Sequence, residues 1–224
     1  MITLQKIVRI LCVAGIIFYN HLSAEKQPAL SVTIRFITPQ ALALEEIQRH
    51  RQIASDSFYV YDTSIVADVG SKEFYDDYFE EFFESFMQQD EEELFLFSAY
   101  DTQGKIVGGM YGRILADPHK VLGLTHGQKA YCISCIYVDQ ALQKRGIATA
   151  LVSALIIRAQ IDPLPVPIFL YTYAIHTAAR KIYENCGFTL MTDKKHPNGE
   201  WALAARALFF GDRCLIAPVA YRKN

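Results

Sequence analysis

The clearest hydrophobic pattern of the chain lies in residues 72–89. Its aromatic side chains recur as pairs four residues apart, so that on a helix they form one continuous stripe. The stripe comprises Phe74, Tyr75, Tyr78, Phe79, Phe82, Phe83 and Phe86, and the opposite face carries Asp76, Asp77, Glu80, Glu81 and Glu84. The pattern predicts an amphipathic helix that packs its aromatic face on a core.

Alternating or continuous apolar runs predict strands around this helix. Residues 31–37 alternate, and a helix follows from Thr38-Pro39, with apolar positions Leu42, Ala43, Ile47 and Ile53 and a looser stretch over 55–70. Residues 94–100 and 106–115 flank a turn at 101–104 and predict a hairpin. An apolar run at 131–138 then leads into a helix over about 146–160.

The C-terminal part repeats the strand-to-helix alternation. We expect a strand at 168–175, a helix at 176–185 ended by Cys186-Gly187, and a hairpin of 188–192 with 201–210. Residues 214–217 suggest a last strand without a clear place. The whole order predicts an α/β (α+β) fold: one domain, residues 25–224, with a central mixed β-sheet flanked by helices.

Residues 1–24 have the order of a secretory signal peptide. Lys6 and Arg9 precede an apolar run from Ile10 to Phe18, and the small pair Ser23-Ala24 follows. An uncleaved membrane anchor and a buried N-terminal helix are the alternatives. A real leader predicts a secreted, periplasmic or membrane-anchored protein with N-terminal membrane contact, and otherwise the protein is cytoplasmic.

Composition excludes several classes of protein. The chain has 224 residues, 51% of them hydrophobic, and a formal net charge of −2, which gives no basic footprint for nucleic acid. Its five cysteines are too few for a disulfide scaffold. Cys132 and Cys135 have the spacing of a redox or zinc pair, but they fall within a predicted strand and lack a second pair. We interpret them as core thiols and expect no metal site.

The segment Gln143–Ala148 carries the most informative chemistry. It joins a buried strand to a helix, so its backbone N–H groups and the helix dipole favour phosphate oxygens. Gly146 and Ala148 allow close approach, while Lys144 and Arg145 add positive charge. A plain strand-to-helix turn is the alternative for this segment taken alone.

A second segment, Ala178–Phe188, helps to interpret the first one. Together the two resemble the GCN5-related N-acetyltransferase (GNAT) family over residues 31–210. The acyl-CoA signature of that family, Gln/Arg-x-x-Gly-x-Gly/Ala, is similar to Gln143, Gly146 and Ala148 here. Its A-x-x-x-Y-E-x-x-G-F helix is similar to a set comprising Ala179, Tyr183, Glu184, Gly187 and Phe188.

The resemblance implies that acetyl-CoA is the co-substrate and indicates where it would bind. The pantetheine arm would lie between the strand at 131–138 and its neighbour, bound by the amides of Ile136 and Val138. The pyrophosphate would rest on a loop made of Gln143, Lys144, Arg145, Gly146, Ile147 and Ala148. His176 replaces an Asn that often contacts the arm in the family; it could donate that bond, act as an acid or base, cap the helix or lie at the surface.

The implied reaction is direct attack of a primary amine on the thioester. An amine of pKa about 10.4 is protonated roughly 2,500 to 1 at pH 7, and a thiol of pKa about 8.5 leaves more easily if protonated. Tyr183 matches the proton donor of many members, with simple packing as the alternative. No general base stands out among Ser134, Cys135, Tyr137 and Asp139, and water is the default.

The sequence leaves the acceptor open. Small amines, peptide N-termini and lysines all fit, with loops 55–71 and 116–129 as candidate walls. The acids Glu80, Glu81 and Glu84 suggest steering of a cationic amine, with a solvated helix face as the alternative. Two further alternatives are a non-catalytic module of the same fold that binds a CoA-like ligand or a protein, and a secreted factor that meets acetyl-CoA in another cell.

Overall fold

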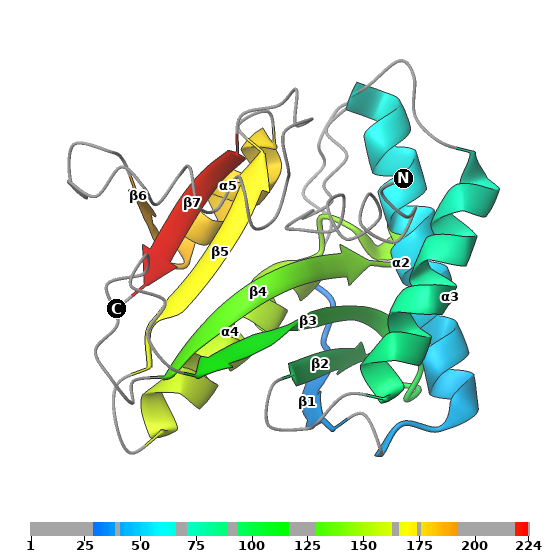
Figure 1. Ribbon diagram of the computed structural model, residues 1–224, viewed down its shortest axis with the longest axis horizontal. Helices are drawn as coiled ribbons and strands as arrows, with labels where there is room; N and C mark the ends of the chain where they lie inside the picture. The colour runs from blue at the N-terminus through cyan, green and yellow to red at the C-terminus, as the bar shows by residue number, and fades with distance from the viewer. Residues whose placement is uncertain are drawn as a thin grey trace, which may run out of the picture.

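The described strands form one seven-stranded sheet in the order β1-β2-β3-β4-β5-β7-β6 (Figure 1). The computed structural model describes residues 29–38, 41–65, 71–88, 94–116, 129–162, 166–173, 176–191 and 218–223. Its strands are β1 (Thr33–Ile37), β2 (Leu94–Tyr100), β3 (Ile106–Ala116), β4 (Lys129–Val138), β5 (Ile168–Tyr173), β6 (Thr189–Met191) and β7 (Pro218–Lys223). Its helices are α2 (Leu44–Ile65), α3 (Lys72–Met87), α4 (Ile147–Ile161) and α5 (Thr177–Asn185), with a short 3-10 turn, η3 (Gln140–Leu142).

The sheet is mixed, as the sequence predicts. The pairs β1–β2, β2–β3 and β3–β4 are antiparallel, and so are β5–β7 and β6–β7. The β4–β5 pair is parallel, because helix α4 forms the crossover between these two strands. The expected hairpin around residues 101–104 is confirmed as β2 and β3.

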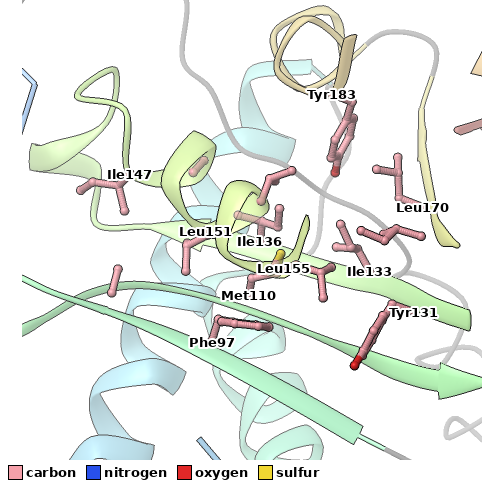
Figure 2. Packing of buried hydrophobic residues seen from close by; sticks show 14 of the residues in the cluster. Phe97, Met110, Tyr131, Ile133, Ile136, Ile147, Leu151, Leu155, Leu170 and Tyr183 are labelled. Carbon is pink, nitrogen blue, oxygen red and sulfur yellow. The ribbon is translucent and has the colours of Figure 1, made fainter. Parts of the chain in front are cut away.

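Two hydrophobic cores cover the two faces of the sheet. Strand β4 shows the division, since Ile136 and Val138 join the core under α4 and α5, whereas Cys135 and Tyr137 join the core under α2 and α3. The core under α4 includes Leu151, Leu155, Ile133, Leu170 and Met110 (Figure 2). Helices therefore flank both faces of the sheet, as expected for this fold class.

The aromatic stripe of residues 72–89 forms the inner face of α3, as predicted. Phe79, Phe83 and Phe86 are at most 1% exposed, and the Phe79 ring packs on Phe58 of α2 at 5.2 Å between centroids. On the outer side, Arg51 of α2 pairs with Glu80 of α3 at 2.7 Å. The two helices run side by side along one edge of the molecule in Figure 1.

Helix α2 corrects the expectation of a loose stretch after residue 55. The helix continues to Ile65, so most of the predicted loop 55–71 is helical. Ser55, Ser57 and Phe58 are buried, and Ser55 donates a 2.6 Å hydrogen bond to Asp76 on α3. Packing against α3 and the sheet stabilises the helix although Phe58, Tyr59 and Val60 have modest helix propensity.

The C-terminal strands also differ from the expectation. Strand β6 pairs with β7, and β7 lies between β5 and β6. Strand β7 at 218–223 is the described partner of β6. The suggested strand at 214–217 and the predicted arm at 201–210 lie outside the described residues. The N-terminal leader at 1–24 and the loop at 116–129, apart from its ends, lie outside them too.

The described helices include none that is both long and apolar enough to cross a membrane.

Candidate acyl-CoA site

Strands β4 and β5 separate part of the way along their length. Their parallel register runs from Tyr131–Ile168 to Ile133–Leu170 and ends there, although β4 continues to Val138 and β5 to Tyr173. The resulting gap opens toward the carboxyl ends of both strands, and both ends lead into the predicted site segments. This is the splayed arrangement that the sequence resemblance implies.

A bulge in β4 determines which backbone groups face the gap. The register with β3 passes from Gly112–Ile133 to Tyr111–Cys135 and so skips Ser134. Farther along, the Asp139 amide donates to Val107 of β3 at 2.9 Å. Because successive backbone groups point to opposite edges of a strand, those of Ile136 and Val138 face away from β3 and toward the gap. The amides of both residues therefore point into the gap.

Helix α2 also reaches this edge of β4. The Ser57 hydroxyl donates to the Val138 carbonyl at 2.8 Å, so a carbonyl on the gap edge is held by a buried serine. The Gln143 side chain donates through Nε2 to the same carbonyl at 3.5 Å, which places the start of the predicted phosphate loop next to the end of β4. The strand edge and the loop form one continuous surface.

The segment 143–148 has the backbone of an anion-binding turn. Gly146 is the N-cap of α4 with φ +85°, and Lys144 also has positive φ, at 62°. A Cβ at Gly146 would meet no atom within 4 Å, so the turn is open on that side. The first N–H groups of α4 have no partner within the helix, and the helix dipole adds to their attraction for an anion.

The side chains of this segment divide between its surface and the core. Lys144 and Gly146 are exposed, Gln143 and Arg145 are half-buried, and the Arg145 carbonyl accepts from the Leu30 amide at 3.2 Å. In contrast, the side chains of Ile147 and Ala148 are buried under the sheet. These two residues can therefore offer a ligand only their backbone.

Tyr183 lies in α5 with its side chain fully buried. Its ring packs on Phe188, with 5.7 Å between centroids, and belongs to the core under α4 and α5. Figure 2 shows the phenol pointing from α5 toward the sheet. Gly187, at φ +82°, ends the helix as predicted, and the Phe188 amide donates to the Tyr183 carbonyl at 3.0 Å.

His176 stands at the N-cap of α5 but does not cap it with its side chain. The imidazole is 4% exposed, and its Nδ1 lies 3.1 Å from the Thr172 hydroxyl of β5. Burial lowers the pKa of His176 to about 3. The surface alternative is thus wrong, and a neutral ring at pH 7 can accept or donate a hydrogen bond but has no proton to give as a strong acid.

A buried polar network under α2 was missed by the sequence reasoning. His50 lies 2.7 Å from the Ser98 hydroxyl through Nε2 and 2.8 Å from the Tyr137 hydroxyl through Nδ1. A neutral imidazole satisfies both bonds, and burial lowers the pKa of His50 to about 4. A Cβ on Gly109 would lie 2.5 Å from the Tyr137 oxygen, so glycine is required there. Two glycines in a row within β3 were the available signal of this close packing.

A cleft of about 610 Å³ lies where α2 meets the end of β4. Its walls are Arg49, Ile53, Asp56, Asp139, Gln140 and Ala141. Arg49 forms an ion pair with Asp139 and donates to the Ile106 carbonyl at 3.2 Å. The cleft adjoins the residues 139–141 that lead from β4 toward Gln143.

The cysteines behave as predicted. Cys132 and Cys135 are buried free thiols, and burial raises the pKa of Cys132 to about 12. Among the described residues, no three His, Cys, Asp or Glu side chains come together as ligands for a metal ion.

Comparisons with known proteins agree with this arrangement. A family model described as acetyltransferase (GNAT) family matches residues 48–188, which is more than half of the chain. No curated protein matches the chain in sequence. Two solved structures illustrate the likeness in fold. NAA60 of Arabidopsis thaliana in complex with a bisubstrate analogue is 15% identical with a TM-score of 0.52, covering 85% of this chain and 97% of that one.

The second structure is the aminoglycoside acetyltransferase HMB0005 from an uncultured soil metagenomic sample. It is 19% identical with a TM-score of 0.50, and the match covers 73% of this chain and 95% of that one. At these identities the likeness shows the shared fold and leaves the substrate open.

Proposed function

Because the chain belongs to the GNAT acetyltransferase family, we propose that it is an acyl-CoA-dependent N-acetyltransferase that moves an acetyl group from acetyl-CoA to a primary amine. The single observation that carries this proposal is the gap between β4 and β5, which ends near the open turn at Gly146 where α4 begins. A nucleotide thioester fits this combination of strand edge and turn. NAA60, of the same fold, is known in complex with a bisubstrate analogue.

The proposed binding mode uses backbone groups more than side chains. The diphosphate lies on the amides at the start of α4, with Lys144 and Arg145 adding positive charge and Gln143 beside them. The pantetheine arm runs back along β4 and pairs with the backbone of Ile136 and Val138. His176, neutral and buried at the start of α5, lies on the β5 side of the gap and is a candidate hydrogen-bond partner of the arm.

The proposed chemistry needs two proton movements. The amine must lose a proton to become a nucleophile, and the CoA sulfur gains one as the C–S bond breaks. We assign the second step to Tyr183, whose phenol projects from α5 toward the sheet. Its full burial removes water from competition for this proton.

The test is turnover by the full-length chain with acetyl-CoA and a panel of primary amines comprising a polyamine, a lysine peptide and a peptide with a free N-terminus. We expect transfer to at least one amine, and Tyr183→Phe should lower kcat by about 100-fold with little change in the KM for acetyl-CoA. Tyr78→Phe, at a buried tyrosine of α3, is the matched control and should keep its kcat.

Two results would contradict parts of the proposal. An equal kcat in wild type and Tyr183→Phe would show that Tyr183 is not the proton donor, while the proposed transferase activity would stand. Binding of CoA without any transfer would favour the non-catalytic module.

A further inference from the structure

Ser134 occupies a distinctive position in the gap. It directly follows Ile133, the last β4 residue that pairs with β5, and it is the bulge residue that the register with β3 skips. At this one point β4 is therefore unpaired with both neighbours. Bulges of this kind change the direction of a side chain and occur frequently next to active sites.

The exposure of Ser134 differs from that of its neighbours. Every other residue from Ala130 to Val138 is buried, whereas Ser134 is partly exposed. Its side chain is thus the one place within this stretch of β4 where solvent reaches the strand. A hydroxyl at that place can both accept and donate a hydrogen bond.

Chain length relates Ser134 to the reacting thioester. The pantetheine arm has about thirteen bonds from phosphorus to sulfur, which equals the length of about four residues of extended chain. Val138, next to the phosphate turn through Gln143, is four residues from Ser134 along β4. An arm that starts at the turn and follows β4 therefore brings its sulfur to the level of Ser134.

We propose that Ser134 is a catalytic residue of the proposed acetyl transfer, on which this inference rests, and that its hydroxyl relays the proton of the attacking amine to solvent. One N–H proton of the protonated amine passes to the Ser134 Oγ, and the freed nitrogen then forms a bond with the thioester carbonyl carbon. The hydroxyl proton of Ser134 passes at the same time to a solvent water. The C–S bond then breaks as the sulfur takes the Tyr183 proton, and the surplus proton on the newly acylated nitrogen restores the Tyr183 phenol.

The experiment compares Ser134→Ala, Ser134→Thr and wild type with acetyl-CoA and the amine of the panel that wild type acetylates fastest. At pH 7 we expect Ser134→Ala to lower kcat by about 10-fold or more, while the KM for acetyl-CoA stays within about twofold. The defect should shrink toward pH 9, where roughly 100-fold more of the amine is already deprotonated. Ser134→Thr keeps a hydroxyl and should stay close to wild type.

A matched control separates this role from a general loss of serine. Ser153 is a partly exposed serine within α4, and Ser153→Ala should leave the kcat and its pH profile unchanged. A Ser134→Ala enzyme with wild-type kcat, or with a defect that is constant in pH and accompanied by a raised KM for acetyl-CoA, would overturn the relay. Those results would leave the transferase intact, whereas absence of turnover by wild type would overturn the proposed function and the relay together.

Discussion

At the residue scale, Gly146 combines a backbone requirement with the proposed phosphate-binding role. Its φ of +85° suits glycine, and the open space around its Cβ position means that a methyl group there meets nothing in the protein. Stability and binding can therefore be separated at this position. The cost to folding comes from the backbone alone, and the cost to binding comes from the methyl group in the path of the phosphate.

Gly146→Ala should lower the free energy of unfolding by about 1 kcal/mol through the left-handed backbone and should weaken CoA binding by about 10-fold or more. Urea denaturation and calorimetric titration measure the two effects. Gly104→Ala is the matched control, since Gly104 has φ +79° and equally open surroundings in the β2–β3 turn. The control should lose similar stability and keep full CoA affinity; equal affinity in both variants would disprove phosphate binding at Gly146.

Two buried histidines make stability depend on pH at the same scale. Burial lowers the pKa of His50 to about 4 and that of His176 to about 3, from 6.5 in the unfolded chain. Between these values the unfolded state binds more protons than the folded state. Stability is therefore full above pH 6.5 and is lost as the pH falls toward 4, by at most about 1.4 kcal/mol per pH unit for each imidazole.

Urea denaturation at pH 7, 6 and 5 should show this decline, and His176→Gln should show a smaller slope than wild type. The variant keeps a hydrogen-bonding side chain beside Thr172 but has nothing to titrate in this range. An unfolding free energy that stays constant from pH 7 to pH 5 in wild type would contradict the buried, neutral state of both rings.

At the element scale, the acidic side chains of α3 have two roles. Glu80 pairs with Arg51, and Asp76 lies in a cluster with Lys72 and Ser55, so these acids join α3 to α2. Burial of Asp76 disfavours its charged form, yet hydrogen bonds from Lys72 and Ser55 keep the pKa of Asp76 below its usual value. Glu81 and Glu84 are exposed and are better placed to attract a cation from solvent.

The double variant Glu81→Gln with Glu84→Gln should therefore raise the KM for a cationic amine, and more at low salt than at high salt, because salt screens exposed charges. Steady-state kinetics at two ionic strengths measures the effect, with an acceptor of no net charge as the control. An unchanged KM at both salt concentrations would leave these glutamates as a solvated helix face.

Sequence patterns predicted best the elements that have a regular hydrophobic repeat or a glycine at a turn or helix end. The aromatic repeat of α3, the turn at Gly104 and the end of α5 at Gly187 are all local signals, and the structure confirms them. The sequence pattern ended helix α2 too early, because Phe58-Tyr59-Val60 does not favour a helix by itself. Packing on α3 stabilises this part of the helix. The position of β7 between β5 and β6 depends on long-range pairing, which no local pattern encodes.

The features of the candidate site also divide into those that local sequence predicts and those that it does not. The open turn at Gly146 and the gap-facing backbone of Ile136 and Val138 could be predicted from the sequence, because motif spacing fixes their positions relative to one strand and one helix. The bulge at Ser134, the Ser57 bond to Val138 and the network of His50 arise from contacts between distant segments. Such contacts require the assembled fold.

At the scale of the whole molecule, the sheet consists of two parts with a narrow junction. One part is β1 to β4 and the other is β5, β7 and β6, and the two are paired through residues 131–133 and 168–170. A thioester lying in the gap would contact both parts. Its binding free energy would then add to the stability of the junction, as expected for any ligand that binds the folded state alone.

The most direct test of this account is calorimetric titration of the folded, full-length chain with CoA, alongside pantetheine, which lacks the nucleotide diphosphate. The account predicts a saturable heat with CoA and binding at least about 100-fold weaker with pantetheine, because the turn at Gly146 supplies the diphosphate contacts. No heat with CoA, or equal affinity for the two ligands, would contradict it.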